Sequence, residues 1–151
     1  MKLKDAYNLM KELKEKHSLY DWGFKFDRSV RRFGLCSYRR KTIYLSKKLT
    51  LLNDMNIVKN VILHEIAHAL VNSHNGHNEI WEHKALSIGC DAQRCYDPSK
   101  VIRPKKKYRG KCPVCDNIVL SHKRTVISCG MCWRQSFNKQ FLIKWELNKE
   151  E

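Results

Sequence analysis

Hydrophobic and polar positions follow two different periods along the first half of the chain. Near the N-terminus, apolar residues recur at steps of three or four among lysines and glutamates, which predicts an amphipathic helix: Leu3, Ala6, Tyr7, Met10 and Leu13. Trp22, Phe24 and Phe26 then alternate with polar or small residues, the period of a strand with one buried face. Two further extended runs, 33–38 and 42–45, flank a polar triplet and predict an antiparallel hairpin.

Two helices are predicted after the hairpin. The first covers residues 55–72, and the short side chain of Asn53 or Asp54 is suited to cap it. The second covers residues 78–88, has glutamates in its first turns and is ended by Gly89. With the strands, these helices predict an α+β fold with a short antiparallel sheet, and the histidine motif described below makes the expected type a small zincin-like domain.

The segment 96–111 predicts a basic linker, because it contains two of the three prolines, a run of lysines and arginines, and little apolar periodicity. It separates an expected first domain, residues 1–95, from a smaller second domain, residues 112–151. A chain of 151 residues is long enough for one domain and an appendage.

Charge and cysteine content narrow the class of protein. The formal net charge is +15, and residues 101–151 contribute +8 of it, from 12 Lys and Arg against 4 Asp and Glu. Such an excess favours a polyanionic partner. The N-terminus lacks a secretory signal and no apolar run approaches the roughly 18 residues of a membrane span, so we expect an intracellular protein, cytoplasmic or nucleoid/nuclear. Seven cysteines then indicate thiols or metal ligands rather than disulfides.

The first predicted helix carries His64, Glu65 and His68 among apolar residues. Histidines four apart lie on one helical face, close enough to bind one ion. Glu65 lies about 100° around the helix, where its carboxylate reaches the metal's water without ligating the metal. The segment has the His-Glu-x-x-His pattern of zinc hydrolases, which predicts a catalytic zinc with Glu65 as general base.

A catalytic zinc needs a third protein ligand, and three histidines follow the motif: His74, His77 and His83. We favour His77, because Gly76 before it allows the chain to reverse at the end of the helix. His74 is the alternative, because it lies where a metzincin has its third histidine. The metzincin pattern, however, requires a glycine three residues after the second histidine, and this chain has Val71 there. His83 is expected on the surface of the next helix. The side chain that stabilises the oxyanion is not identified by the sequence.

Two Cys-x-x-Cys pairs in the second domain predict a closed tetrahedral site for a structural zinc: Cys112, Cys115, Cys129 and Cys132. The expected total is therefore two zinc ions per chain. Cys36, Cys90 and Cys95 fit no ligand pattern and are expected to be structural.

Basic residues around these cysteines are candidates for contact with nucleic acid: Lys105, Lys106, Lys107, Arg109, Lys111, Lys123, Arg124 and Arg134. Tyr108 is a candidate for stacking on exposed bases. Trp133 and Phe137 are expected in the core of the small domain, and Trp81 in the core of the larger one.

The segments GLCSYRRKTIYLS, HEIAHALV and GHNEIWEHKALSIGC together resemble the SprT-like (Spartan-type) metalloprotease domain. Asn78, Glu79 and Ile80 depart from the family's Gly-Pro-Glu at this place, whereas His77 and Trp81 keep their separation. The resemblance implies zinc-dependent proteolysis of proteins bound or crosslinked to DNA. We also expect a monomer that binds single-stranded or structured DNA. The alternative is a non-catalytic, zinc-stabilised nucleic-acid-binding or adaptor module.

Overall fold

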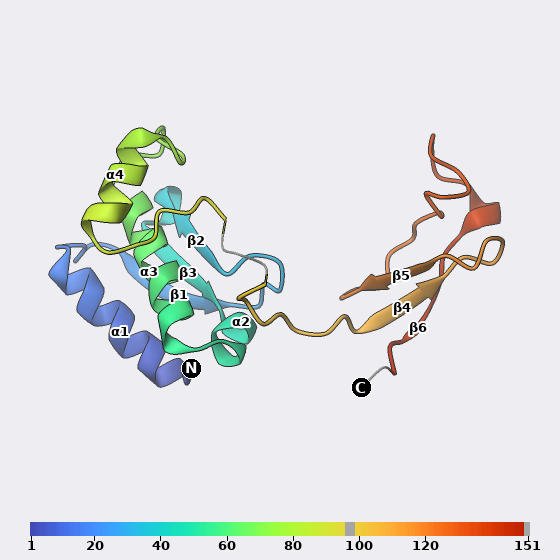
Figure 1. The fold of residues 1–151 in the computed structure, drawn as a ribbon, viewed down its shortest axis with the longest axis horizontal. Coiled ribbons are helices and arrows are strands. Elements are labelled where there is room, and N and C mark those ends of the chain that lie inside the picture. The colour runs from blue at the N-terminus through green and yellow to red at the C-terminus, as the bar shows by residue number, and fades with distance from the viewer. Residues whose placement is uncertain (96–98, 150–151) are drawn as a thin grey trace. The chain divides into compact units, whose positions relative to one another are not determined.

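A computed structural model describes residues 1–95 and 99–149, which form two compact units, Met1–Pro104 and Lys105–Glu151 (Figure 1). The first unit contains, in chain order, α1 (Leu3–Lys16), β1 (Gly23–Asp27), β2 (Gly34–Ser37), the 3-10 turn η1 (Tyr38–Arg40), β3 (Thr42–Ser46), α2 (Lys47–Leu52), α3 (Met55–Leu70) and α4 (Glu79–Ser87). None of the described helices is long and apolar enough to cross a membrane.

The sheet of the first unit has the strand order β1-β3-β2. The predicted hairpin is confirmed: β2 pairs antiparallel with β3 across the turn η1, with Cys36 opposite Ile43. The expectation of an antiparallel sheet is only half right, because β1 pairs parallel with β3. The loop at residues 28–33 carries the chain past β3 to its far edge. β2 is therefore an edge strand.

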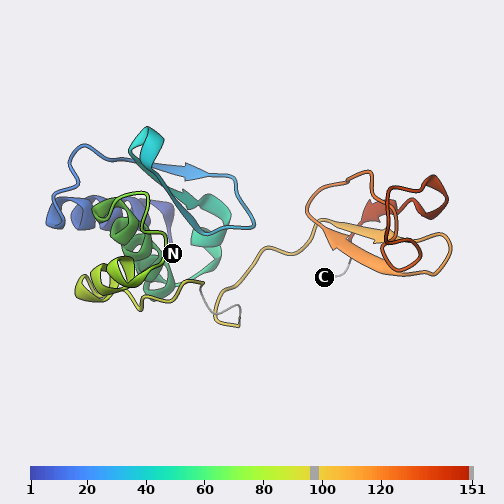
Figure 2. The same ribbon diagram turned by 90° about the horizontal axis from the view of Figure 1, so that it is seen from above.

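Helix α3 is the central helix of this unit. Asp54 caps it by accepting a hydrogen bond from the Ile57 N–H at 3.0 Å, which selects Asp54 from the two predicted caps. α3 contacts α1, α4 and β2, and Figure 2 shows these helices on one side of the sheet. The side chains of Ile62, Ile66 and Val58 on α3 are fully buried in this layer.

The chain after α4 is tied back to the core of the first unit. Gly89 follows the helix with a φ of 89°, the left-handed conformation expected of a residue that ends a helix. The Asn53 side chain then clamps Ile102: its Nδ2 donates to the Ile102 carbonyl and its Oδ1 accepts from the Ile102 N–H. Val101 is buried beside this clamp.

The second unit is a three-stranded antiparallel sheet in the order β5-β4-β6, made of β4 (Tyr108–Lys111), β5 (Ile118–Ser121) and β6 (Lys144–Leu147), with a short turn η2 (Lys139–Phe141). Its buried hydrophobic residues are Cys112, Cys129 and Ile143. The range predicted as linker, 96–111, contains β4 at its end and the buried Val101 near its middle. Residues 96–98 of that range, and 150–151 of the predicted second domain, lie outside the described residues.

Candidate metal centre

Helix α3 presents the two histidines of the motif on one face, as its 3.6-residue period requires. The rings of His64 and His68 lie one turn apart with their centroids separated by 5.0 Å. Both side chains are half-buried, whereas Glu65, on the neighbouring face, is only 7% exposed. The helix therefore directs its imidazoles and its carboxylate toward different parts of one cavity.

A loop held by three asparagines presents the third histidine. Asn72 Oδ1 accepts from the Asn75 side chain at 2.9 Å, and Asn75 Oδ1 accepts from the Asn78 side chain at 3.1 Å. Asn78 in turn caps α4 by accepting from the Trp81 N–H. Gly76 adopts a φ of 51°, so the predicted reversal occurs where expected. This chain of amides fixes the backbone on both sides of His77.

The ring nitrogens of the three histidines converge. His77 Nε2 lies 3.1 Å from both His68 Nε2 and His64 Nε2. Nitrogens bound to a tetrahedral zinc at its usual distance are roughly 3.3 Å apart. The spacing of the three donors therefore fits one metal ion with a fourth position for another ligand.

The surroundings keep these imidazoles neutral. Burial, with a contribution from His77, lowers the pKa of His64 to about 4, and burial likewise lowers the pKa of His68 to about 4. The pKa of His77 is lowered by burial and by the positive charge of Arg94. Neutral rings offer lone pairs to a metal, so the electrostatics match the geometry.

The carboxylate of Glu65 faces the edge strand β2. The Cys36 backbone N–H donates a hydrogen bond to it, and the side chain packs against the backbone of Gly34. Burial raises the pKa of Glu65 to about 8, opposed by that hydrogen bond and by the charge of Arg32. A cavity of about 340 Å³ is lined by Glu65 and by all three histidines. A buried carboxyl group and three histidines that could hold a metal ion thus line the same cavity.

Three contacts around the metal centre were not anticipated from the sequence. The Gln93 backbone carbonyl accepts a hydrogen bond from the His64 ring, which opposes the lowering of the His64 pKa by burial. The Tyr38 hydroxyl donates to the His68 carbonyl at 2.7 Å. Trp81, buried in the core as predicted, lies 4.5–5.1 Å from the three imidazole rings.

The other two candidates for the third ligand lie elsewhere. Of His74, His77 and His83, the structure brings His77 alone into the cluster with His64 and His68. His77 lies in the loop that directly precedes α4. One helix and a loop provide the histidines, because α4 starts only after Asn78 has capped it.

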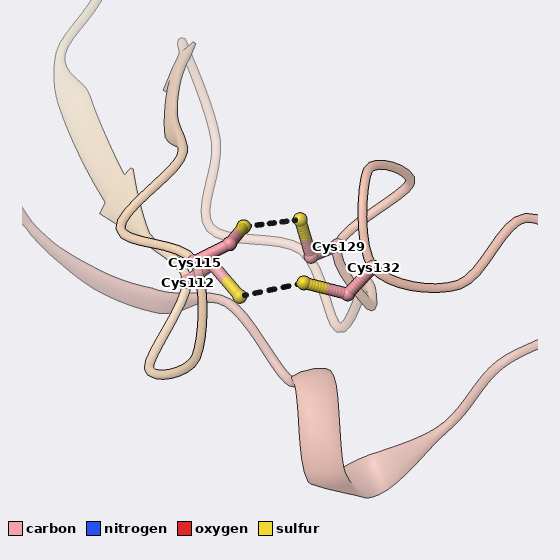
Figure 3. Close-up of side chains that lie close together, drawn as sticks. All are labelled: Cys112, Cys115, Cys129 and Cys132. Atoms are coloured by element: carbon pink, nitrogen blue, oxygen red, sulfur yellow. Dashed lines mark hydrogen bonds between the residues drawn. The ribbon is translucent and has the colours of Figure 1, made fainter.

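The four cysteines of the second unit also converge (Figure 3). Cys115 Sγ lies 3.6 Å from Cys129 Sγ, and Cys112 Sγ lies 3.9 Å from Cys132 Sγ. Thiolates on a tetrahedral zinc are roughly 3.8 Å apart. Hydrogen bonds from the backbone of Cys132 and Met131 help to lower the pKa of Cys129 to about 6, which favours the thiolate. This group could hold a second metal ion in a closed site.

The basic residues proposed for nucleic acid all belong to the second unit, on both faces of its sheet. Strand alternation puts Arg109 and Lys111 on the face opposite to Tyr108. The Arg124 guanidinium lies over the Tyr108 ring at 5.0 Å and the Lys107 ammonium at 5.4 Å, so these two cations gather around one aromatic ring. Arg109 and Lys111 thus lie on the face opposite to the one on which Arg124 and Lys107 gather.

Two expectations about buried residues are wrong. Trp133 and Phe137 are 38% and 50% exposed, because Ile143 and two of the cysteines fill the small core in their place. Among the remaining cysteines, Cys90 is buried and Cys36 half-buried, as structural residues would be, but Cys95 is exposed.

The model of the SprT-like family matches residues 3–101. Protein SprT of Glaesserella parasuis serovar 5 (strain SH0165) is 28% identical over 115 residues, which cover 68% of this chain and 73% of that protein.

Proposed function

This chain belongs to the SprT-like family, and from that premise we propose that it is a zinc-dependent endopeptidase that cuts proteins bound or crosslinked to DNA. The family suggests a domain of the metalloprotease type. The zinc, the proteolytic activity and the DNA-associated substrate are the proposal.

The observation that carries the proposal is the shared cavity of His64, Glu65, His68 and His77. The three neutral imidazoles, with His77 Nε2 at 3.1 Å from the Nε2 atoms of His64 and His68, fit a zinc ion that keeps one open position. A structural zinc site needs no buried carboxylate beside it. Glu65 therefore favours a hydrolase over a non-catalytic zinc module.

The residues of the chain divide the chemistry among them. A bound zinc supplies Lewis acidity, which makes water more acidic and polarises a peptide carbonyl. Glu65 accepts the proton of the attacking water at its carboxylate and then donates it to the departing amine. The Cys36 N–H orients that carboxylate, and the charge of a cation in the cavity favours its ionised form. The Tyr38 proton is committed to the His68 carbonyl, so Tyr38 holds the ligand helix.

The second unit is proposed as the nucleic-acid anchor. Residues 101–151 carry a net charge of +8, and the candidate contacts are Lys105, Lys106, Lys107, Arg109, Lys111, Lys123, Arg124 and Arg134. The exposed rings of Trp133 and Phe137 are available to stack on unpaired bases, which favours single-stranded or structured DNA.

The test is the Glu65→Gln variant with a DNA-binding protein as substrate. We expect the variant to retain zinc, measured by elemental analysis, and the wild-type melting profile, while cleavage falls by about a thousandfold or more. Cleavage by the wild type is expected to rise when single-stranded DNA is added.

Three results would contradict parts of this proposal. Equal cleavage by Glu65→Gln and wild type would exclude Glu65 as the base. Zinc and DNA binding by the wild type without cleavage would indicate the adaptor module. A cleavage rate that is the same with and without DNA would indicate a general peptidase.

A further inference from the structure

A second cavity, of about 350 Å³, adjoins the metal centre within the first unit. It shares Gly34, His64 and Glu65 with the cavity described above. Four arginines from three separate segments of the chain line it: Arg31, Arg32, Arg94 and Arg103. A group of guanidinium side chains therefore lies beside the metal centre.

The four arginines make this cavity strongly positive, but they differ in how far a substrate could pair with them. Arg32 forms a 2.5 Å ion pair with Asp27, yet its charge still acts on Glu65. Arg94 is exposed, and its charge acts on His77, so it lies within electrostatic reach of the metal centre. Among the described residues that line the cavity, the acidic ones are Glu65 and Asp91, and the Asp91 carboxylate already accepts the Gln93 N–H at 3.1 Å.

The lining also has an apolar part. Phe33 and Val61, both almost completely buried, reach the wall between the arginines. An apolar base with guanidinium groups around it matches a side chain that has methylene groups and a terminal carboxylate. Arginine presents paired N–H donors that fit the two carboxylate oxygens.

We propose that this cavity is a substrate subsite for an acidic side chain, glutamate above all, close to the scissile bond, with Arg94 as its specificity-determining residue. The proposal depends on the proposed function and adds a substrate class to it. The phosphates of a DNA strand are the less suitable occupant. A strand binds along an extended row of cations, and its phosphates would make no contact with the apolar side chains of Phe33 and Val61.

The experiment compares cleavage sites. The zinc-loaded wild-type protein digests a denatured protein mixture in the presence of single-stranded DNA, and mass spectrometry identifies the bonds that are cut. Matched peptides around one such bond then carry Glu, Gln or Lys at the preferred position. We expect kcat/KM for the Glu peptide to exceed that for the Gln peptide by about tenfold, the size of one charge-assisted hydrogen bond.

Two variants with the same change in net charge make the comparison specific. In Arg94→Glu, the ratio of Glu to Gln cleavage should fall below one and the Lys peptide should gain. Arg28→Glu changes an exposed arginine of the 28–33 loop that does not line the cavity, and it should keep the wild-type ratio. Arg94→Gln provides a milder variant, and zinc content measured for each protein shows that the metal centre is intact.

The outcomes separate this proposal from the proposed function. Cleavage without preference for acidic residues, or an unchanged ratio in both Arg94→Glu and Arg94→Gln, overturns the subsite alone. A loss of single-stranded DNA affinity in Arg94→Glu, measured by fluorescence anisotropy, with an unchanged peptide ratio, reassigns the cavity to phosphate. A wild type that cleaves nothing rejects the proposed function, and the subsite with it.

Discussion

Gly34 on the edge strand lies directly against the side chain of Glu65 on α3. A Cβ placed on residue 34 would come within 2.7 Å of Glu65 Cγ and 2.8 Å of Glu65 Cδ, closer than real contacts allow. The absence of a side chain at this one position therefore makes room for the proposed general base.

The Gly34→Ala variant tests this relationship. The added methyl group should displace the Glu65 carboxylate and lower cleavage by about 100-fold, the effect of a misplacement of around 1 Å. Zinc content should stay unchanged, because the three atoms nearest to the added methyl group all belong to Glu65 and none to a histidine. Gly130→Ala is the control, since a Cβ there meets nothing within 4 Å, and it should cleave like the wild type. Full activity in Gly34→Ala would contradict the placement of Glu65.

The second prediction concerns the metal ligands. Wild-type protein should bind about two equivalents of zinc, whereas His77→Ala should keep about one, in the cysteine site. His74→Ala should keep both, because His74 lies outside the cluster of ring nitrogens. Elemental analysis of the three purified proteins gives the answer. If His74→Ala lost zinc and His77→Ala did not, His74 rather than His77 would be the third ligand.

The third prediction concerns the loop of asparagines. Removing the amide in Asn75→Ala breaks its links to both Asn72 and Asn78, so His77 becomes less well positioned. Groups that orient a metal ligand contribute about tenfold or more to affinity, and zinc competition with a chelating dye should show a loss of that order for one of the two ions. Asn56→Ala, an exposed position on α3, provides the comparison and should bind both ions normally.

The fourth prediction concerns removal of metal from the second unit. Its described core consists of Ile143 and two of the proposed ligands, so little apolar burial remains once the metal is gone. Structural zinc contributes about 10 kcal/mol or more to the folding of such small domains. Hydrogen exchange after treatment with a chelator should show loss of protection over residues 105–149, with α1 and the strand β3 still protected. Protection that persists in β4–β6 would contradict a metal-dependent fold.

The elements with a strong local signal could be predicted from the sequence. The period of α1, the alternation of the strands, the cap of α3, the end of α4 before Gly89 and the turn at Gly76 depend on neighbouring residues, and all appear close to their predicted places. The parallel pairing of β1 with β3 could not be predicted, because strand order depends on contacts between distant segments.

In the metal centre, too, the features that depend on neighbouring residues could be predicted, and those that depend on distant segments could not. The spacing of His64 and His68 follows from the helical period, and Gly76 indicated the loop that carries His77. The contacts of Gly34, Gln93 and Tyr38 with the site come from segments 30 or so positions away in sequence, and no local pattern indicates them. Burial of aromatics in the small second unit was mispredicted because the cysteines themselves occupy its interior.

The two donor sets differ in chemical softness. Four thiolates form a soft site that attracts ions such as Cu(I), whereas three imidazoles suit borderline ions such as Zn²⁺, Ni²⁺ or Co²⁺. Because each set lies in its own compact unit, a mixture of metals would be sorted along the chain. Contamination by a soft metal would then change the second unit first and leave the three histidines of the first unit their own ion.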